Sequence, residues 1–491
     1  MMYLSKSKYC LGVQCKKILW LDKYSPEESE NVTNDEVFDV GNKVGELAKE
    51  LFGFHIDINF SEDLKQMLAD TENLLKLENI VITEASFVYE NNFCSVDILK
   101  KEGDSYEIYE VKSSTYVKDT HLDDIAYQTF ILRNLGYNVT KCSIVHIDNT
   151  YVRNGDLQLN KLFKIVDVTD IVLSKQDEIK NNIIEISNYM NSNIEREEKL
   201  GIHCLKPYKC RYFKYCTGHL GANNIFKLSD IRNDKKFKLY NDGIITYEDL
   251  LNEDISDKAR QQIEFELYDK EDYIDKEQIK TFLNTLSYPL YFLDFETFQQ
   301  AIPEYNGISP YMKIPFQYSL HYILEAGGEV LHKEFLAEAG IDPRRSLAEK
   351  LVEDIPKDVC VLAYNMSFEK GVIRNLAALY PDLSEHLLNI HNDIKDLMIV
   401  FSKRYYYTKE MYGSYSIKYV LPALFPDDPS LNYHSLELVH NGEEASNLYA
   451  NMEYLPKEEQ EKLRESLLKY CGLDTYAMVK IWEKLIEQVK E

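Results

Sequence analysis

The sequence has few basic residues for its number of acidic ones. It contains 56 Lys and Arg against 82 Asp and Glu, which gives a formal net charge of -26 over 491 residues. Proteins that coat nucleic acid need clustered Lys and Arg to neutralise phosphates, so this balance argues against such a protein. An enzyme that acts on one strand end is still compatible with it, because metal-binding carboxylates add to the negative total and a local groove can be basic.

Long apolar runs are also missing. No stretch approaches the roughly 20 apolar residues of a membrane-spanning helix, and the opening MMYLSKSKYC has no apolar core of the signal-peptide type. We therefore expect a soluble, cytoplasmic protein without a membrane partner. In that compartment the nine cysteines are expected to be free, metal-bound or cluster-bound rather than paired in disulfides.

The sequence does contain enough apolar material for several folded cores. Hydrophobic residues make up 45% and aromatic residues 12% of the chain, and its length predicts two to four domains. Residues 1–220 and 286–491 each alternate strand-like and helix-like segments, which predicts two α/β domains. Residues 221–285 are charged and helical and are expected to form a connector. Its segment LYNDGIITYEDLLNEDI suggests two short helices around a turn, either as plain structure or as a DNA-gripping hairpin.

Residues 291–298, YFLDFETF, form a strand-like run that carries two acids in its middle. Side chains alternate between the two faces of a strand, so Asp294 and Glu296 point the same way. Two carboxylates held that close repel and raise each other's pKa, at a cost of order 1 kcal/mol, unless a cation lies between them. The pattern therefore predicts a site for a divalent metal ion.

A second group of polar residues lies in the first α/β stretch. SVDILKK places Asp97 on one strand, and YEVKSS places Glu110 and Lys112 on one face of the next. The two carboxylates could hold Mg²⁺ or Mn²⁺, and Lys112 could orient the attacking water or stabilise a charged phosphate. Gln128, on the helix that follows, could position a nucleotide or the water, and Tyr127 lies beside it. The alternative is a strand with a surface ion pair, which is common and contributes little to stability.

Three regularly spaced cysteines lie in HCLKPYKCRYFKYC, namely Cys204, Cys210 and Cys216. Thiols at this density indicate a soft metal centre whose fourth ligand comes from elsewhere in the chain. Cys15, in LGVQCKKILWL, is the candidate for that ligand, with Cys10 as the substitute. Zinc is an alternative to iron and sulfur, because Zn²⁺ accepts four Cys or three Cys and one His, and His203 is adjacent.

The early Cys before a basic-aromatic run, the D…ExK core with its Gln helix and the three late Cys resemble RecB-type PD-(D/E)XK nucleases with an iron-sulfur cluster. The CRISPR-associated four-cysteine nucleases and the helicase-nuclease AddB share this layout. The resemblance covers about residues 3–220 and implies a restriction-endonuclease-like fold. It also implies that Glu84, in ITEASF, is the acid that precedes the metal-binding Asp. A [4Fe-4S] cluster would tie the first and last segments of this domain together through Cys15, Cys204, Cys210 and Cys216.

The sequence departs from this pattern on its first long helix, DEVFDVGNKVGELAKELFG. Nucleases of this type commonly carry a metal-binding His about one helical turn after a Gly. Here Gly41 is followed at that spacing by Gly45, with Glu46 next. Either Glu46 replaces the His or this metal site is weakened.

The last α/β stretch holds two further acids. YNMSFEKGV places Glu369 at the start of a helix, after a turn shaped by Asn365 and Phe368. YCGLD places Tyr470 and Asp474 on one face of the final helix. With the YFLDFETF acids they can surround two metal ions ~4 Å apart, one activating water and one stabilising the leaving 3′ oxygen, while the tyrosine orients the water. Taken singly, each acid could instead be a solvated surface residue.

The order D-x-E, N-x-x-F-E and Y-x-x-x-D resembles the DnaQ-like 3′-5′ exonucleases of the DEDD type, tyrosine subclass, which have an RNase H-like fold. Glu369 departs from the Asp usual at its position but keeps the carboxylate. Asp396, in IKDLM, lies where such domains often open another helix, and could contact the nucleotide or be structural. With GSYSIKYVLPALFP, both halves together resemble a bacterial family, a domain of unknown function, that fuses a RecB-like nuclease to an RNase H-like exonuclease.

These resemblances imply a metal-dependent nuclease that degrades DNA single strands or ends, in repair, recombination or defence against mobile DNA, with a helicase or repair protein as partner. The alternatives are an RNA-directed 3′-5′ exonuclease, an iron-sulfur DNA-binding scaffold with an inactive N-terminal nuclease, and a zinc-stabilised interaction protein. The expected ligands of Mg²⁺ or Mn²⁺ are Asp294, Glu296, Glu369, Asp474, Glu84, Asp97 and Glu110.

Overall fold

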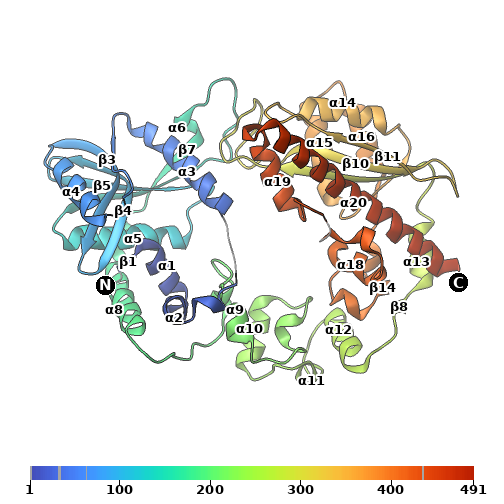
Figure 1. Ribbon diagram of the computed structural model, residues 1–491, viewed down its shortest axis with the longest axis horizontal. Helices are drawn as coiled ribbons and strands as arrows, with labels where there is room; N and C mark the ends of the chain where they lie inside the picture. The colour runs from blue at the N-terminus through green and yellow to red at the C-terminus, as the bar shows by residue number, and fades with distance from the viewer. Residues whose placement is uncertain (1–2, 31–34, 62, 434–435, 491) are drawn as a thin grey trace. The chain divides into compact units, whose positions relative to one another are not determined.

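The computed structural model describes residues 3–30, 35–61, 63–433 and 436–490 of the chain, and it has the mixed α/β architecture that the sequence predicts (Figure 1). The chain divides into two compact units. The first consists of Met1–Gly221 and Gln300–Tyr311, and the second of Ala222–Gln299 and Met312–Glu491. The segment that follows the acidic strand therefore packs with the first unit, although its neighbours on both sides belong to the second.

The first unit is built on a seven-stranded sheet of order β2-β3-β4-β5-β6-β7, with β1 pairing beside β4. Its strands are β1 (Leu4–Ser5), β2 (Ile56–Asp57), β3 (Asn79–Tyr89), β4 (Asn92–Glu102), β5 (Ser105–Lys112), β6 (Asn138–Ile147) and β7 (Phe163–Asp167). Strands β3, β4 and β5 form an antiparallel meander, whereas β5 and β6 run parallel and are joined through α5 (Asp119–Asn134). This order brings the acids predicted on β4 and β5 onto adjacent strands.

Helices cover both faces of this sheet. One core packs α5 with its buried Ile125 and Ile131 against the sheet, together with the helix α8. The other core packs Val44 of α3 with Tyr109 of β5 and with Ala301 from the inserted segment 300–311. The helices of this unit are α1 (Lys6–Gln14), α2 (Lys16–Tyr24), α3 (Asp35–Lys49), α4 (Leu64–Leu74), α5, α6 (Leu159–Leu162), α7 (Thr169–Ser174), α8 (Gln176–Met190) and α9 (Phe213–Thr217).

The second unit begins with the predicted helical connector. Its helices are α10 (Asn233–Asn241), α11 (Tyr247–Leu250), α12 (Asp257–Tyr268) and α13 (Lys276–Leu283), and the strand β8 (Tyr273–Ile274) lies between the last two. Gly243, between α10 and α11, has a φ of 85°, a value that glycine adopts without a steric penalty. The turn predicted between two short helices is confirmed.

A five-stranded sheet of order β11-β10-β9-β12-β13 forms the centre of the second unit. Its strands are β9 (Leu290–Phe298), β10 (Ile314–Ile323), β11 (Leu331–Leu336), β12 (Cys360–Ala363) and β13 (Ile394–Asp396). β9, β10 and β11 are antiparallel neighbours, and β12 and β13 are added in parallel. A further short strand, β14 (Tyr406–Tyr407), pairs with β8.

The two faces of β9 meet different helices (Figure 1). On one face Leu293 and Phe295 pack into a core with α14 (Arg344–Asp354), α15 (Ser367–Leu379) and α16 (Ser384–Asp393). The opposite face lies under the 34-residue helix α20 (Lys457–Lys490), where Trp482 contacts Phe292 with ring centroids 5.8 Å apart. The remaining helices are α17 (Ile399–Ser402), α18 (Ile417–Leu424) and α19 (Gly442–Asn451). The acids of β9 therefore lie between the sheet and α20.

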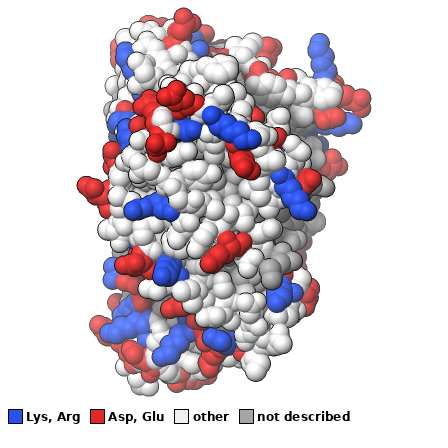
Figure 2. Space-filling view, turned by 90° about the vertical axis from the view of Figure 1, so that its left-hand side faces the viewer, with Lys and Arg blue, Asp and Glu red and all other residues white. Residues whose placement is uncertain are grey.

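Among the described helices, none is both long and apolar enough to cross a membrane. Figure 2 shows one face of the molecule, on which Lys and Arg are interspersed with Asp and Glu rather than gathered in a basic stripe.

Candidate active site

Three of the predicted acids meet between β9 and α20. Asp294, Glu296 and Asp474 each offer a carboxylate oxygen, and these three oxygens lie within 4.8 Å of one another. The strand contributes two of the groups because they are separated by one residue, as the alternation of side chains requires. The helix contributes the third group, and the thiol of its Cys471 lies 3.7 Å from Oδ2 of Asp294. Oxygen ligands at this spacing fit a divalent cation.

The fourth predicted acid, Glu369, lies in the first turn of α15 and is 1% exposed. Its Oε2 is buried and has no hydrogen-bond partner among the described residues. Its charge acts on both Asp294 and Glu296, so it faces the same group of acids, although its oxygens lie outside the tightest cluster. A buried carboxylate oxygen without a donor is costly, and a bound cation would remove that cost.

The turn before Glu369 is held in place by Asp396, at the end of β13. One carboxylate oxygen of Asp396 accepts the backbone N–H groups of Asn365 and Met398, each at 3.0 Å. Asn365 has a φ of 71°, a left-handed conformation that Asn tolerates better than most residues. Asp396 therefore has the structural role that the sequence left open, since it supports the turn that orients α15.

Burial raises the pKa of every acid in this group, and the charges of the other acids add to the effect on Asp294 and Glu296. Burial, with Asp474 as the nearest charge, raises the pKa of Glu296 to about 8. Burial, with a contribution from Asp396, raises that of Glu369 to about 8. Burial also raises the pKa of Asp474, to about 6, and that of Asp294 well above its usual range. No Lys or Arg of the described chain forms an ion pair with these four carboxylates. A bound cation would therefore offset their negative charge.

Two tyrosines approach Asp474. The hydroxyl of Tyr433 donates a 2.6 Å hydrogen bond to Oδ1 of Asp474, and the predicted Tyr470 also bonds to this carboxylate. The two rings lie 6.1 Å apart, and burial raises the pKa of both phenols well above the usual value. Sequence reasoning missed Tyr433, because it lies 41 residues before Asp474, outside α20, and no spacing rule connects the two.

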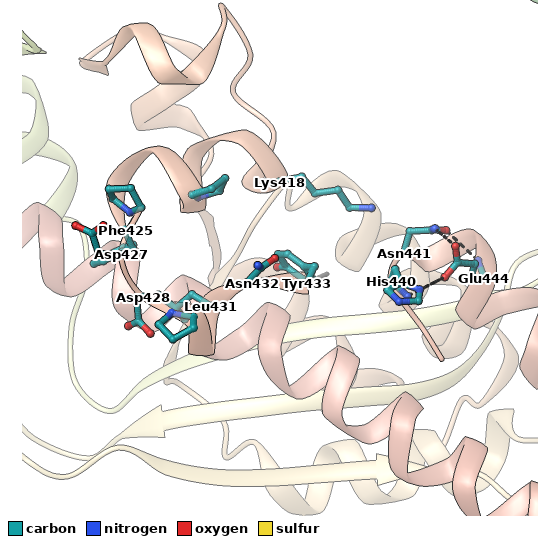
Figure 3. A pocket seen from close by; sticks show the side chains of 13 residues that line it. Lys418, Phe425, Asp427, Asp428, Leu431, Asn432, Tyr433, His440, Asn441 and Glu444 are labelled. Atoms are coloured by element: carbon teal, nitrogen blue, oxygen red, sulfur yellow. Dashed lines mark hydrogen bonds and ion pairs between the residues drawn. The ribbon is translucent and has the colours of Figure 1, made fainter. Parts of the chain in front are cut away.

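A cavity of about 1020 Å³ opens beside the acids (Figure 3). Phe425 and Pro426 supply an apolar wall, while Tyr433 and Asn441 lie on the side toward the acids. Asn441 precedes Gly442, where an added Cβ would lie 3.5 Å from Oε2 of Glu296. The cavity therefore borders the carboxylate group.

The side chain of Lys418, from α18, extends into this cavity (Figure 3). It forms no ion pair with a described residue, yet its charge lowers the pKa of Glu296 and of Asp474, on which burial has the larger and opposite effect. A lysine in this position can contact one phosphate of a strand while the next phosphate reaches the acids. The sequence stretch SIKYV contains this lysine, but only the fold reveals where it points.

The family described as "Domain of unknown function (DUF2779)" matches residues 291–416. This range contains β9 and the start of α15, with three of the four acids, and ends before α20. Over most of its length, 91%, the chain is also similar at 21% identity to "Uncharacterized protein UU173" of Ureaplasma parvum, of which 84% is covered. Neither name states an activity, so the chemistry of the site has to be argued from its residues.

The first unit brings its own predicted residues together around Glu110, which is fully buried. Nε2 of Gln128 donates to Oε2 of Glu110 at 2.6 Å, and Nζ of Lys112 lies 2.6 Å from Oε1. Asp97 lies beside them and accepts the backbone N–H of Val111 at 2.8 Å. All four predicted side chains thus share one centre, as their positions on β4, β5 and α5 require.

Two residues that sequence reasoning missed complete this centre. Asp124, on α5, forms an ion pair with Lys112, and Lys6, at the start of α1, lies 2.8 Å from Oε1 of Glu110. Burial alone would raise the pKa of Glu110, but the ammonium groups of Lys112 and Lys6 hold it well below its usual range. Burial and the charge of Glu110 raise the pKa of Asp124 to about 6.

Three further predictions around this centre have different outcomes. Glu84 has a φ of 56°, and burial next to Asp97 raises its pKa to about 7, so it faces the centre as predicted. Glu46 instead forms an ion pair with Lys49 at 2.6 Å, and its side chain is 72% exposed. Its described contacts give it no part in the centre, because the exposed face of α3 turns it toward solvent. Tyr127 stacks on Tyr9, with ring centroids 4.6 Å apart, and has a structural role.

The cysteines of the predicted cluster lie in one part of the first unit. Cys15 packs in the same small core as Cys210, and Nε2 of Gln14 donates to the backbone oxygens of His203 and Tyr208, each at 2.8 Å. Burial raises the pKa of Cys210 to about 11, and the nearby thiols of Cys216 and Cys204 act in the same direction. None of the nine cysteines is paired in a disulfide, and no group of three lies within 4.8 Å among the described residues.

Cys10, named as the substitute ligand, lies elsewhere. Burial raises its pKa to about 12, and the charges that act on it are those of Asp124 and Lys112. It therefore lies beside the carboxylate centre rather than among the other cysteines, because it is in the middle of α1, whereas Cys15 follows the end of that helix. His203 contacts the thiol of Cys204 at 3.6 Å through Nε2.

Proposed function

We propose that the second unit is a metal-dependent nuclease that hydrolyses phosphodiester bonds at the end of a DNA strand, with 3′-5′ polarity. The observation that supports this most directly is the group of four buried carboxylates without an ammonium partner in the described chain. Burial raises the pKa of every member, and repulsion within the group adds to this for Asp294 and Glu296, which is a cost to the folded protein unless cations bind there. Active sites are where such unfavourable arrangements concentrate.

The residues present fit Mg²⁺ or Mn²⁺, because hard divalent cations prefer oxygen ligands and the group offers carboxylates only. Asp294, Glu296 and Asp474 would hold the metal, and the unpartnered Oε2 of Glu369 would complete the set. Bound divalent ions at such a site supply a water that ionises near neutral pH and stabilise charge on the leaving oxygen.

The side chains around the acids have complementary tasks. The hydroxyl groups of Tyr433 and Tyr470 bond to Asp474 and fix the orientation of its carboxylate. Tyr470 is placed to orient the attacking water. Lys418 lies in the adjoining cavity and would contact a phosphate next to the scissile one, while Phe425 offers a ring on which a base can stack. These groups bind and orient the strand, and positioning of this kind accounts for much of phosphoryl-transfer catalysis.

A single strand end suits this cavity better than a duplex. A base stacks on an aromatic wall only when its own face is free, which requires an unpaired end. We favour DNA on the strength of the family resemblance, with a role in repair, recombination or defence against mobile DNA and a helicase or repair protein as partner. RNA-directed 3′-5′ exonuclease activity is the second candidate, because exonucleases of the tyrosine subclass also process RNA.

For the first unit we propose an iron-sulfur scaffold that binds nucleic acid. Zn²⁺ holds its sulfur ligands around a single ion at about 2.3 Å each, which draws the sulfurs close together. No cysteine trio in the described chain has that spacing. In a [4Fe-4S] cluster each thiolate binds a different iron, so wider spacing is compatible, and Cys15, Cys204, Cys210 and Cys216 are the ligands we propose.

The decisive experiment measures degradation of end-labelled strands. Single-stranded DNA, double-stranded DNA and RNA of one sequence are incubated with the full chain and Mg²⁺ or Mn²⁺, and the label is placed at the 5′ or the 3′ end. We expect single nucleotides to be released from the 3′ end of single-stranded DNA, and Asp294→Ala to abolish the release. Product formation that is unchanged in Asp294→Ala, or an absence of products from all three substrates, would refute the proposal.

The cluster is tested separately. Protein purified without oxygen is expected to be brown, with about four irons per chain, and Cys210→Ser is expected to lose both colour and iron. Colourless wild-type protein that contains stoichiometric zinc would overturn the iron-sulfur assignment. The nuclease proposal for the second unit does not depend on this result.

A further inference from the structure

Lys6 lies in the middle of the carboxylate centre of the first unit. Its Nζ is 2.8 Å from Oε1 of Glu110, 3.5 Å from Oδ1 of Asp97 and 3.8 Å from Oδ1 of Asp124. The ammonium group thus has a carboxylate oxygen from β4, from β5 and from α5 around it. A divalent cation in a nuclease of this type would be surrounded by acids from these same elements.

The other oxygens of these acids also have donors. Oε2 of Glu110 accepts from Gln128 at 2.6 Å, and Oδ2 of Asp97 accepts from the backbone N–H of Val111 at 2.8 Å. Lys112 bonds to Oε1 of Glu110 and to Oδ2 of Asp124. With Glu84, four carboxylates therefore face two ammonium groups. Oδ1 of Asp124 has no hydrogen-bond donor, and its described partner is the ammonium group of Lys6 at 3.8 Å. A metal ion at this centre would have to displace that ammonium group.

The position of Lys6 is fixed by its neighbours along the chain. Leu4 pairs with Asn92 in the short strand β1, and its carbonyl oxygen accepts the hydroxyl of Tyr127. Ser5 caps α1 by accepting the N–H of Lys8 at 3.3 Å. One turn later the ring of Tyr9 is fully buried and stacked on that of Tyr127. Lys6 is therefore held between two anchored residues, and its side chain starts directly above the acids.

The two acidic groups of the protein differ in this respect. The acids of the second unit have no ammonium partner among the described residues, whereas Glu110 of the first unit has two, Lys6 and Lys112. In the first unit the described chain supplies the positive charge itself. The metal implied by the resemblance to PD-(D/E)XK nucleases does not fit this arrangement.

We infer that Lys6 is a tethered cation that takes the place of the divalent metal in the first unit, so that this centre binds no Mg²⁺ or Mn²⁺ while α1 remains docked. The centre then stabilises the fold without hydrolysing a strand. The first unit then binds the nucleic acid, and the second unit hydrolyses it. This inference goes beyond the proposed nuclease activity of the second unit and stands on different residues.

Binding of Mn²⁺ to the full chain tests the inference without any activity measurement. The variant Asp294→Asn/Asp474→Asn removes the metal site of the second unit, so any Mn²⁺ that remains bound reports on the first. In this background we expect no bound Mn²⁺ by electron paramagnetic resonance or equilibrium dialysis. Adding Lys6→Met should create one site for Mn²⁺ per chain, because the acids lose their ammonium partner while the side chain keeps its apolar stem.

Two matched variants complete the experiment. Lys6→Arg retains the positive charge and should gain no site. Adding Glu110→Gln to Lys6→Met should abolish the gained site. The Asp294→Asn/Asp474→Asn protein could instead bind Mn²⁺ and lose it when Glu110→Gln is added. That result would show that the centre takes metal with Lys6 present, and would overturn the inference. This arm retains Lys6, so it decides the matter even if Lys6→Met does not fold. Folded Lys6→Met protein without a new site would also overturn it.

Discussion

The two units neutralise buried carboxylates in opposite ways. In the first, the ammonium groups of Lys6 and Lys112 lie within 3 Å of Glu110 and hold its pKa low. In the second, burial raises the pKa of Glu296 and Glu369 to about 8, with smaller contributions from Asp474 and Asp396 respectively. A carboxylate that is paired with an ammonium group stabilises the fold. A group of carboxylates without such partners is stabilised only when a cationic ligand binds to it. Similar acids on similar strands therefore differ in charge environment according to whether the described chain supplies an ammonium group beside them.

Activity should separate the two centres most strongly. Asp294→Ala or Asp474→Asn removes a metal ligand and should lower the rate of strand degradation by roughly a thousandfold or more. Glu110→Gln should leave most of the activity intact, because its centre is not the hydrolytic one. The measurement is the initial rate of nucleotide release from a labelled single strand. If Glu110→Gln lowers the rate as much as Asp294→Ala does, the proposed difference in activity between the two centres is wrong.

Stability should change with opposite sign in the two centres. Glu110→Gln leaves two buried ammonium groups short of a partner and should destabilise the first unit by about 3 kcal/mol. Asp294→Asn, measured with EDTA, relieves repulsion among buried acids and should stabilise the second unit by about 1 kcal/mol. Hydrogen exchange followed by mass spectrometry resolves the units separately. A shift of the same sign in both would contradict the comparison.

Metal ions should stabilise only one of the two units. At a Mn²⁺ concentration about 100 times Kd, binding to the native state contributes about 2.7 kcal/mol. This should raise the melting temperature of the second unit by roughly 5 °C. Calorimetry with and without EDTA measures the shift, and Asp474→Asn serves as the control that should lose it. The transition of the first unit should not move.

The smallest effect is expected in the cavity beside the acids. Lys418→Ala should weaken binding of a single-stranded oligonucleotide about tenfold and reduce the slope of affinity against salt concentration by about one. Fluorescence anisotropy in Ca²⁺ measures both quantities without hydrolysis. Lys403→Ala, an exposed lysine of the same unit that does not line the cavity, is the matched control. Equal affinities for Lys418→Ala and wild type would remove this lysine from the site.

Local patterns predicted the elements that carry the acids. The alternation in YFLDFETF placed two carboxylates on one face of β9, and the periodicity of the last residues gave α20 nearly to its ends. Local patterns could not reveal that Lys6 belongs to the carboxylate centre of the first unit. Lys6 approaches Asp97 only because β1 pairs with β4 and α1 is docked. Contacts of this kind depend on topology, and the sequence spacing between two residues does not encode it.

The sequence also predicted only some of the residues of the candidate active site. Spacing rules found Tyr470, four residues before Asp474 on one helix, but not Tyr433, whose hydroxyl reaches the same carboxylate from an irregular segment. The sequence also left open whether Glu46 replaces the expected His, because helical periodicity does not show which face of α3 is covered. Glu46 lies on the exposed face and pairs with Lys49.

The segment 300–311 has a consequence for how the protein is made. Arg153 donates its backbone N–H to Ile308 at 3.0 Å and its guanidinium to Pro303 at 2.7 Å, and Ala301 fills part of the core beside α3. The ribosome must therefore translate past residue 311 before the first unit can close, although β9 has already emerged by then. A recombinant fragment that ends at residue 221 would leave that apolar surface bare and should be prone to aggregate.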